Sequence, residues 1–122
     1  MLGNYKLQCL QMLYKEKTGW GVYTKDFIPK DTLIERAIMM RVENVDGNEN
    51  PHLFTWSDDR LTWVAGSGMT PFYNHSENPN ISKKGDLIND VLEIYASKDI
   101  EPGEELLGTY SSKKWRKCFQ NF

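Results

Sequence analysis

The stretch Phe72-Tyr73-Asn74-His75-Ser76-Glu77-Asn78-Pro79-Asn80 decides how the rest of the chain is interpreted. Its Asn, His and Ser side chains are groups that hydrogen-bond nearby backbone, and the proline disfavours a helix at the residue before it. Two aromatic rings and an imidazole fall within its first four positions, which suits a pocket wall better than a solvated connector. The stretch therefore predicts a rigid, polar, non-helical loop beside a binding site.

A second informative stretch follows later in the chain as Glu104-Glu105-Leu106-Leu107-Gly108-Thr109-Tyr110. Its tyrosine comes at the end of a short apolar run that is typical of a strand. A tyrosine at a strand end is more often a core or rim residue than a catalyst, so spacing alone assigns it no catalytic role.

Length and composition limit the class of protein. The 122 residues, of which 39% are hydrophobic, predict one domain over residues 1–122 with a real core. No run reaches the length of a membrane span, and residues 1–6 have no charged segment leading into an apolar one, so we expect an intracellular protein away from membranes. The net charge of −2 gives no broad basic surface, so we expect no direct binding to nucleic acid.

Metal chemistry is not expected. The soft metal ligands of the chain are Cys9, His52, His75 and Cys118. No two of them have the spacing that places ligands on one turn or one helix face. Cysteine-rich segments are likewise absent before and after the central region. We therefore interpret both cysteines as ordinary thiols and predict no metal site.

Short strands and tight turns dominate the pattern. Strands are predicted at residues 5–14, 20–24, 32–42, 52–56, 61–65 and 91–96, with a turn at 83–86. No long helix is predicted. The segment 25–34 recurs as 98–107, each with Lys-Asp, a proline turn and a second apolar run. The same corner is thus used twice, which fits a mostly β, largely antiparallel fold with few short helices.

Several familiar chemistries are excluded by missing parts. Gly19-Trp20-Gly21 lacks the third glycine and the helix of a dinucleotide fold, and no phosphate-binding loop motif is present. Ser76 beside His75 is no catalytic triad, because neighbouring residues of an extended loop point apart and no third member is evident.

Three motifs in order resemble a known family. They are Gly19-Trp20-Gly21-Val22, then Asn74-His75-Ser76-x-x-Pro79-Asn80, then Glu105-Leu106 with Tyr110 four residues on. Together they resemble the SET-domain protein lysine methyltransferases, and are most similar to the minimal, free-standing viral type. The resemblance covers essentially the whole chain, and its second motif is the most specific.

The resemblance implies a β-rich fold in which the C-terminal segment threads past the polar loop in a knot-like arrangement. It implies that Tyr110 is catalytic and that S-adenosylmethionine is the methyl donor. Implied cofactor contacts are Gly19, Trp20, Gly21, Asn74, His75 and Trp115. Implied walls of the substrate lysine channel are Tyr23, Trp56, Phe72, Tyr73 and Gly108. The implied substrate is a histone tail or another lysine-containing protein, and a histone would place the enzyme in the nucleus.

Some positions depart from the family pattern and bear on the product. Gly108 stands where the family tends to have a residue that crowds the lysine amine, and glycine has no side chain. Unless Tyr73 or Thr109 fills the gap, di- and trimethyl-lysine are expected to accumulate. The departures also keep two other interpretations open, a catalytically silent module that binds a basic peptide and a purely structural β domain. A homodimer is a further expectation, because the C-terminal tail is apolar.

Overall fold

The computed structural model describes residues 7–43, 53–57 and 61–109. Its strands are β1 (Leu10–Lys15), β2 (Gly19–Thr24), β3 (Leu33–Val42), β4 (Leu53–Thr55), β5 (Trp63–Gly66), β6 (Asn74–His75), β7 (Ile81–Asp86), β8 (Val91–Ala96) and β9 (Leu107–Gly108). Two short 3-10 helices, η1 (Leu7–Cys9) and η3 (Thr70–Phe72), complete the described elements. The predicted mostly β fold with few short helices is confirmed.

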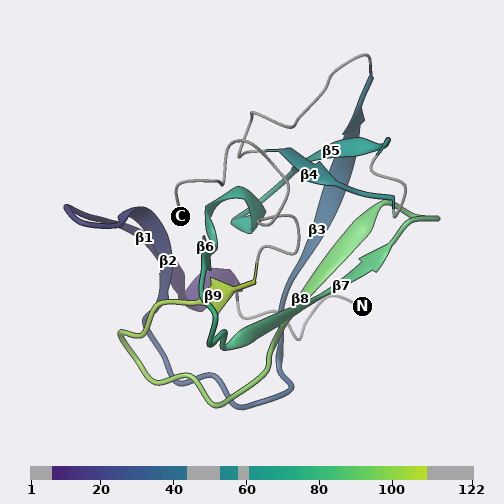
Figure 1. Ribbon diagram of the computed structural model, residues 1–122. Coiled ribbons are helices and arrows are strands. Elements are labelled where there is room, and N and C mark those ends of the chain that lie inside the picture. The colour runs from purple at the N-terminus through teal and green to yellow at the C-terminus, as the bar shows by residue number, and fades with distance from the viewer. Residues whose placement is uncertain (1–6, 44–52, 58–60, 110–122) are drawn as a thin grey trace.

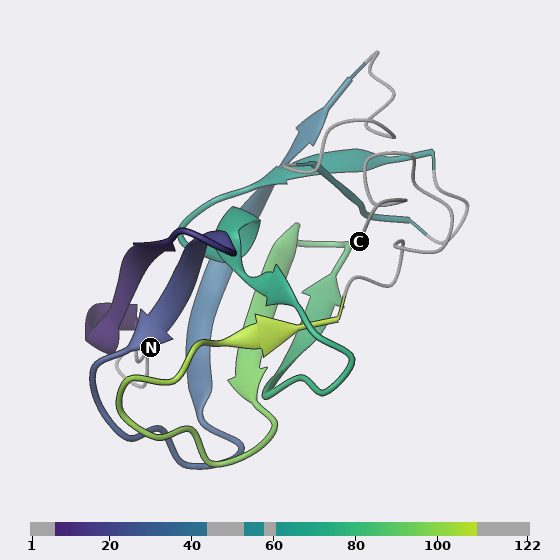
Figure 2. The ribbon, with the colours of Figure 1, turned by 60° about the vertical axis from the view of Figure 1, so that its left-hand side comes forward.

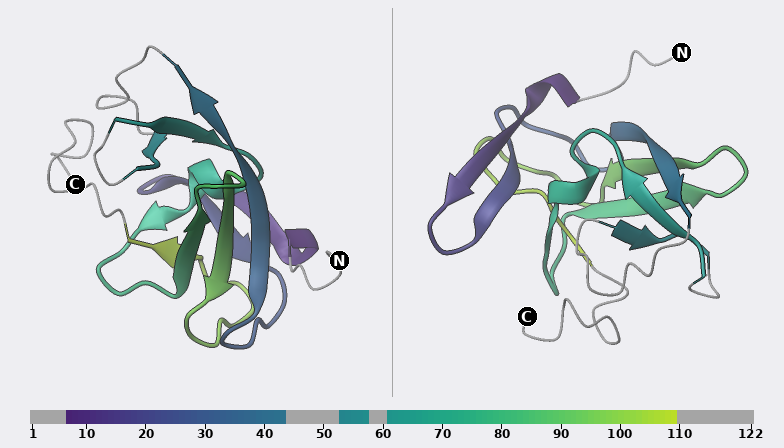
Figure 3. Two further views of the ribbon diagram at one scale, coloured as in Figure 1. Left: turned by 90° about the vertical axis from the view of Figure 1, so that its right-hand side faces the viewer. Right: turned by 90° about the horizontal axis from the view of Figure 1, so that it is seen from above.

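Three sheets make up the described part of the molecule. β1 and β2 form an antiparallel hairpin, β4-β5-β3-β8-β7 form a five-stranded antiparallel sheet, and β6 pairs with β9 in parallel (Figure 1). The long strand β3 pairs with β8 through its first half and with β5 through its second. Figure 3, seen from above, shows the β1-β2 hairpin on one side, the five-stranded sheet on the other, and β6 and η3 between them.

Most predicted strands are confirmed, but the strand predicted at 5–14 begins only at Leu10, after the 3-10 helix η1, and one predicted turn is wrong. β2, β3 and β8 agree with the predicted strands at 20–24, 32–42 and 91–96 to within a residue. Residues 83–86, predicted as a turn, instead belong to β7. β7 is an edge strand that fully buries only Ile81, so its sequence lacks the apolar alternation that marks a half-buried strand. The turn follows β7, where the Asp86 carboxylate accepts hydrogen bonds from the backbone of Ile88 and Asn89.

The two similar corners of the sequence pair with each other. Ile28 and Ile100, which occupy equivalent positions in the repeated pattern, form an antiparallel bridge with N–H to oxygen distances of 2.9 and 2.8 Å. Both side chains are fully buried. The Asp99 carboxylate also accepts a hydrogen bond of 2.8 Å from the backbone of Lys30. The two repeated segments therefore pair with each other and close the lower end of the fold in Figure 1.

A buried polar pair holds the loop before η3 against β3. Glu35 is 2% exposed, and its carboxylate accepts hydrogen bonds from the Tyr73 hydroxyl at 2.7 Å and the Met69 backbone at 2.9 Å. A Cβ on Gly68, whose φ is +61°, would overlap the Glu35 carboxylate. Burial raises the pKa of the Glu35 carboxyl above its ordinary value, while the hydrogen bonds from Tyr73 and Met69 oppose that rise.

The Glu35 carboxyl makes stability depend on pH in a predictable direction. Because its folded pKa lies above the unfolded value of about 4.3, its contribution is fully present below that pH and is lost as pH rises through the folded pKa. The unfolding free energy of wild type minus that of Glu35→Gln should therefore fall as the pH rises above about 4, by about 1.4 kcal/mol per unit of pKa shift.

Denaturant unfolding across this pH range measures the difference, with Glu16→Gln in the exposed β1-β2 turn as the control. A difference that stays constant or rises with pH would contradict the assignment.

Candidate active site

Three stretches that are remote in sequence meet beside β2. The Leu106 backbone N–H donates to the Val22 carbonyl at 2.8 Å, which joins the segment before β9 to β2. β6 and β9 then pair in parallel, with Asn74 opposite Leu107. Figure 1 and Figure 2 both show β6 and β9 side by side. The polar loop and the late Glu-Leu stretch, quoted first from the sequence, thus form one site.

Asn80 stabilises the junction, which is the region where β2, β6 and β9 meet. Its side-chain nitrogen donates to the Glu105 carbonyl at 2.8 Å, and its side-chain oxygen accepts from the Leu107 N–H at 2.8 Å. Its backbone N–H donates to the Leu107 carbonyl at 3.0 Å, and its carbonyl accepts from Ser97 at 2.9 Å. Asn80 is only 9% exposed. The buried side chain of Asn80 therefore ties the end of the polar loop to β9 and to the residue before it, while its backbone carbonyl accepts from the residue after β8.

Asn74 is fixed by two acceptors. Its side-chain nitrogen donates to the Trp20 carbonyl at 3.0 Å and to the Glu105 carboxylate at 2.7 Å. The other Glu105 oxygen accepts from the Tyr23 hydroxyl at 3.3 Å. Burial, followed by the nearby Glu105 carboxylate, raises the pKa of Tyr23, so the hydroxyl remains a donor. Because both amide hydrogens of Asn74 have partners, the direction of its carbonyl oxygen is also fixed.

Gly21 of β2 must be a glycine, because the Asn74 and Glu105 side chains lie close to its backbone. A Cβ on Gly21 would lie within 3.0 Å of the Asn74 side-chain nitrogen and closer still to the Glu105 carboxylate. Gly19 has a φ of +73°, in the left-handed region that other residues rarely adopt. Trp20 between them is 55% exposed and packs edge-to-face on Tyr14 with ring centroids 5.6 Å apart. The three residues predicted to contact a cofactor therefore lie together, with an aromatic ring open to solvent.

His75 and Gly108 lie opposite each other in the β6-β9 pair. The His75 ring, 10% exposed, lies 3.0 Å from a Glu77 carboxylate oxygen. The next residue, Ser76, donates its N–H to the Gly108 carbonyl at 2.8 Å, and its own carbonyl accepts from the Thr109 hydroxyl at 3.1 Å. The backbone that leads to Tyr110 is therefore held against the polar loop as far as Thr109.

The residues predicted to line the substrate channel are more scattered. Tyr23 and Gly108 lie at the junction. Phe72 ends η3 and packs on the core, and Tyr73, 1% exposed, turns its hydroxyl to Glu35 within the core. Trp56 lies over Gly85 of β7 and donates its ring N–H to Asp90 at 2.9 Å. Tyr73 thus has a structural role, and Trp56 covers the far end of β7.

Two predicted site residues, Tyr110 and Trp115, lie outside the described residues, as do His52 and Cys118. Three residues that shape the site were not predicted as site residues. Glu105 and Asn80 were quoted only as parts of motifs, and their hydrogen bonds across the junction have no local signal. Lys83 was placed in a turn, whereas it lies on β7 with its Cε 3.1 Å from the position of a Cβ on Gly108.

Side chains of β7 lie next to Gly108, and the predicted di- and trimethylation stays a prediction. Lys83 and Ile81 both contact the position that a Gly108 side chain would take, Ile81 at 3.5 Å. The atom nearest to that position is the Lys83 Cε, at 3.1 Å.

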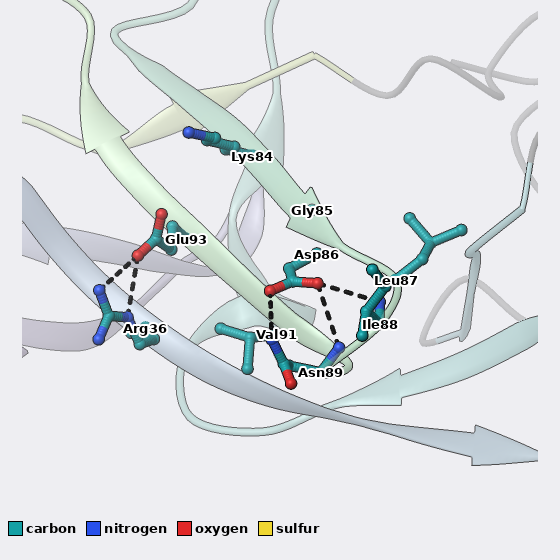
Figure 4. Close-up of a pocket in the computed structure, with 9 residues that line it drawn as sticks. All are labelled: Arg36, Lys84, Gly85, Asp86, Leu87, Ile88, Asn89, Val91 and Glu93. Atoms are coloured by element: carbon teal, nitrogen blue, oxygen red, sulfur yellow. Dashed lines mark hydrogen bonds and ion pairs between the residues drawn. The ribbon is translucent and has the colours of Figure 1, made fainter.

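A separate hollow lies on the exposed face of β3, β8 and β7 (Figure 4). Its residues are Arg36, Lys84, Gly85, Asp86, Leu87, Ile88, Asn89, Val91 and Glu93. An ion pair of 2.6 Å joins Arg36 to Glu93 on this face. Among the described residues, none of those predicted to contact the cofactor or to wall the channel lines this hollow, which is therefore distinct from the junction.

Within 7–43, 53–57 and 61–109, no three His, Cys, Asp or Glu side chains gather in the manner of metal ligands. The same part of the chain contains no helix with the length and apolar character needed to cross a membrane.

Comparisons with known proteins agree with the geometry. A family model described as the SET domain matches residues 19–111. The Schizosaccharomyces pombe histone-lysine N-methyltransferase, H3 lysine-37 specific, is 26% identical over 113 residues, which cover 87% of this chain and 76% of that protein. The Mus musculus histone-lysine N-methyltransferase SETMAR is 32% identical over 130 residues, covering 85% of this chain and 40% of that protein.

Solved structures show the same fold. A Plasmodium falciparum protein assigned as a histone methyltransferase superposes with a TM-score of 0.67 at 23% identity, over 84% of this chain and 92% of that one. A humanized Chaetomium thermophilum Polycomb Repressive Complex 2 bound to an inhibitor gives the same score and identity, over 85% of this chain and 15% of that one.

Proposed function

Because the chain belongs to the SET-domain family, we propose that it is a protein lysine N-methyltransferase that uses S-adenosylmethionine and acts on a histone tail. The observation that carries the proposal is the junction in which Asn74 bonds both to Trp20 and to Glu105. It brings together the residues that the sequence motifs assign to one site. The relatives named as histone-lysine N-methyltransferases support the choice of substrate.

The residues at the junction suit a cationic amino-acid cofactor. The carbonyl oxygen of Asn74 has a fixed direction and is an acceptor for an ammonium group, and the Glu105 carboxylate lies 2.7 Å from the same side chain. The exposed ring of Trp20 offers a face to a sulfonium or to an apolar stem. The tight approach at Gly21 leaves no room for a side chain there. Gly19, Trp20, Gly21, Asn74 and His75 would hold the cofactor, with Trp115 as the proposed aromatic contact to adenine.

S-adenosylmethionine supplies a methyl group activated by a positively charged sulfur. The chain's own task is then to position a neutral lysine amine in line with that group, because positioning supplies much of the rate enhancement in such a transfer. A free lysine has a pKa of about 10.4, so deprotonation at neutral pH costs several kcal/mol at about 1.4 kcal/mol per unit. An apolar channel and a nearby positive charge both lower that pKa. We assign to the Tyr110 hydroxyl the orientation of the amine.

A histone substrate implies that the protein acts in the nucleus on a flexible, basic tail. The partner would be recognised by its lysine side chain in the channel.

Asn74→Ala is expected to weaken the affinity for S-adenosylmethionine by about tenfold or more, because a hydrogen bond to a charged group is worth about 1.5–3 kcal/mol. Isothermal titration calorimetry of the purified chain with S-adenosylmethionine measures the change. Asn78→Ala, an exposed residue of the same loop, is the control and should bind like wild type. Equal affinities for wild type and Asn74→Ala would remove Asn74 from the cofactor site. A wild-type chain that binds no cofactor would favour a purely structural domain.

A further inference from the structure

The outward face of the five-stranded sheet has aliphatic side chains open to solvent. Ile38 of β3 is 66% exposed, Ile88 in the turn after β7 is 93% exposed, and Met40 and Leu87 are exposed as well. Ile38 lies opposite Val91 of β8, which lines the hollow of Figure 4 together with Leu87 and Ile88. Side chains that are paired across two strands lie on the same face, so these five residues form one aliphatic surface at the hollow. An exposed apolar surface bordered by charged side chains is typical of a protein interaction site.

The turn that carries Leu87 and Ile88 is held in place although it is exposed. Arg41 of β3 donates to the Asp90 carboxylate at 2.9 and 3.0 Å and to the Leu87 carbonyl at 3.1 Å. The Trp56 ring N–H donates to the same carboxylate at 2.9 Å. Because these bonds fix the backbone of the turn, less conformational entropy is lost when a partner binds to it.

The two carboxylates that line the hollow already have hydrogen-bond donors within the protein. The oxygens of Glu93 accept from Arg36 at 2.6 Å and from the Tyr95 hydroxyl at 2.9 Å. The oxygens of Asp86 accept from the Asn89 backbone at 3.1 Å and from the Asn89 side chain at 2.8 Å. Neither carboxylate therefore depends on a partner for a donor.

Lys84 differs from these carboxylates. It lines the same hollow, opposite Glu93 in the pairing of β7 with β8. Hydrogen bonds from Arg36 and Tyr95 lower the pKa of Glu93, and the charge of Lys84 adds to that effect. Among the described residues, however, the Lys84 ammonium has no hydrogen-bond or ion-pair partner, and Figure 4 shows it without a dashed line. The charge that this surface offers to a partner is therefore positive, beside aliphatic side chains.

We propose that the hollow and the aliphatic surface bind a segment of another protein in which aliphatic side chains stand next to an aspartate or a glutamate. The aliphatic side chains of the segment cover Ile38 and Ile88, and its carboxylate accepts hydrogen bonds from Lys84. A second copy of the chain matches this surface less well, because its carboxylates on the same face are already bonded. Nucleic acid matches it poorly, because its phosphates would approach Asp86 and Glu93. The proposal concerns a face outside the junction and does not rest on the methyltransferase function.

A display library of short random peptides, selected on the purified full chain, tests the chemistry of the partner. Enriched peptides should combine leucine, isoleucine, valine or methionine with at least one aspartate or glutamate. A synthetic copy of the most enriched such peptide is then titrated with the wild-type chain and its variants by fluorescence anisotropy.

Three variants separate the charge from the apolar contact. Lys84→Glu should weaken binding of the acidic peptide by about tenfold or more, because repulsion replaces a charge-assisted hydrogen bond. A peptide with lysine in place of its acidic residue should regain affinity for Lys84→Glu. Ile88→Ser should also weaken binding by about tenfold, because most of an exposed aliphatic side chain is removed. Lys30→Glu, in the exposed turn before β3, is the charge-matched control and should bind like wild type.

Thermal unfolding verifies that each variant is folded, and light scattering gives the oligomeric state. An acidic, aliphatic peptide whose affinity falls in Lys84→Glu and Ile88→Ser, but not in Lys30→Glu, supports the proposal. The proposal is overturned if the library enriches no such peptide, or if the enriched peptide binds all three variants like wild type. A wild-type dimer that Ile88→Ser separates into monomers also overturns it, because a second copy would then occupy the surface.

Discussion

Tyr110→Phe is expected to lower the rate of methyl transfer by about a hundredfold or more while the fold and the affinity for S-adenosylmethionine are retained. The substitution deletes only a hydroxyl, and misplacement of a reacting group by about 1 Å is enough to cost on the order of 10²-fold in rate. Thr109, its neighbour in sequence, is already held to the polar loop through the Ser76 carbonyl. The backbone path to Tyr110 should therefore be the same in the variant.

Single-turnover rates with a histone H3 peptide measure this effect separately from cofactor binding. Calorimetry with S-adenosylmethionine serves as the control on the same sample. A turnover within a few-fold of wild type would show that Tyr110 is not the catalytic residue.

Asn80→Ala is expected to lower the free energy of unfolding by about 2–4 kcal/mol. The substitution leaves the Glu105 carbonyl and the Leu107 N–H without their side-chain partner, and each unsatisfied buried group costs about 1–3 kcal/mol. Denaturant unfolding measures the loss, and an unchanged m-value would show that the difference lies in stability.

The same loop offers a matched control in Asn78. Its side-chain oxygen accepts a hydrogen bond from Lys98, but the residue is exposed, so Asn78→Ala should stay within about 0.5 kcal/mol of wild type. A loss below about 1 kcal/mol for Asn80→Ala would mean that the junction does not depend on its side-chain amide.

The sequence predicts much of the fold because several of its strands have clear local patterns. β8 alternates inward and outward residues, and its predicted bounds are those of the structure. β7 lacks such alternation because it lies at the edge of the sheet, so its two lysines resemble a polar turn. Because residues 83–86 were predicted as a turn, the place of Lys83 beside Gly108 was not predicted. That place depends on the register of β7 with β8.

The site itself is predicted in part. Motifs placed Asn74 and Gly21 in one site, and the structure brings them into contact through Glu105. The two-residue parallel pair of β6 and β9 leaves no periodic pattern in the sequence, so its register and the clamp at Asn80 follow only from long-range pairing. The pairing of Ile28 with Ile100 is similar, since the repeat indicates two like corners but not that they face each other.

The measurement that tests the account most directly is the mass of core histones and of a histone H3 tail peptide after incubation with the wild-type chain and S-adenosylmethionine. The account predicts methylated lysine in the wild-type reaction and almost none with Tyr110→Phe. A folded wild-type chain that binds S-adenosylmethionine by calorimetry yet leaves every histone lysine unmodified would contradict it, and would identify the chain as a catalytically silent module or as an enzyme for another protein.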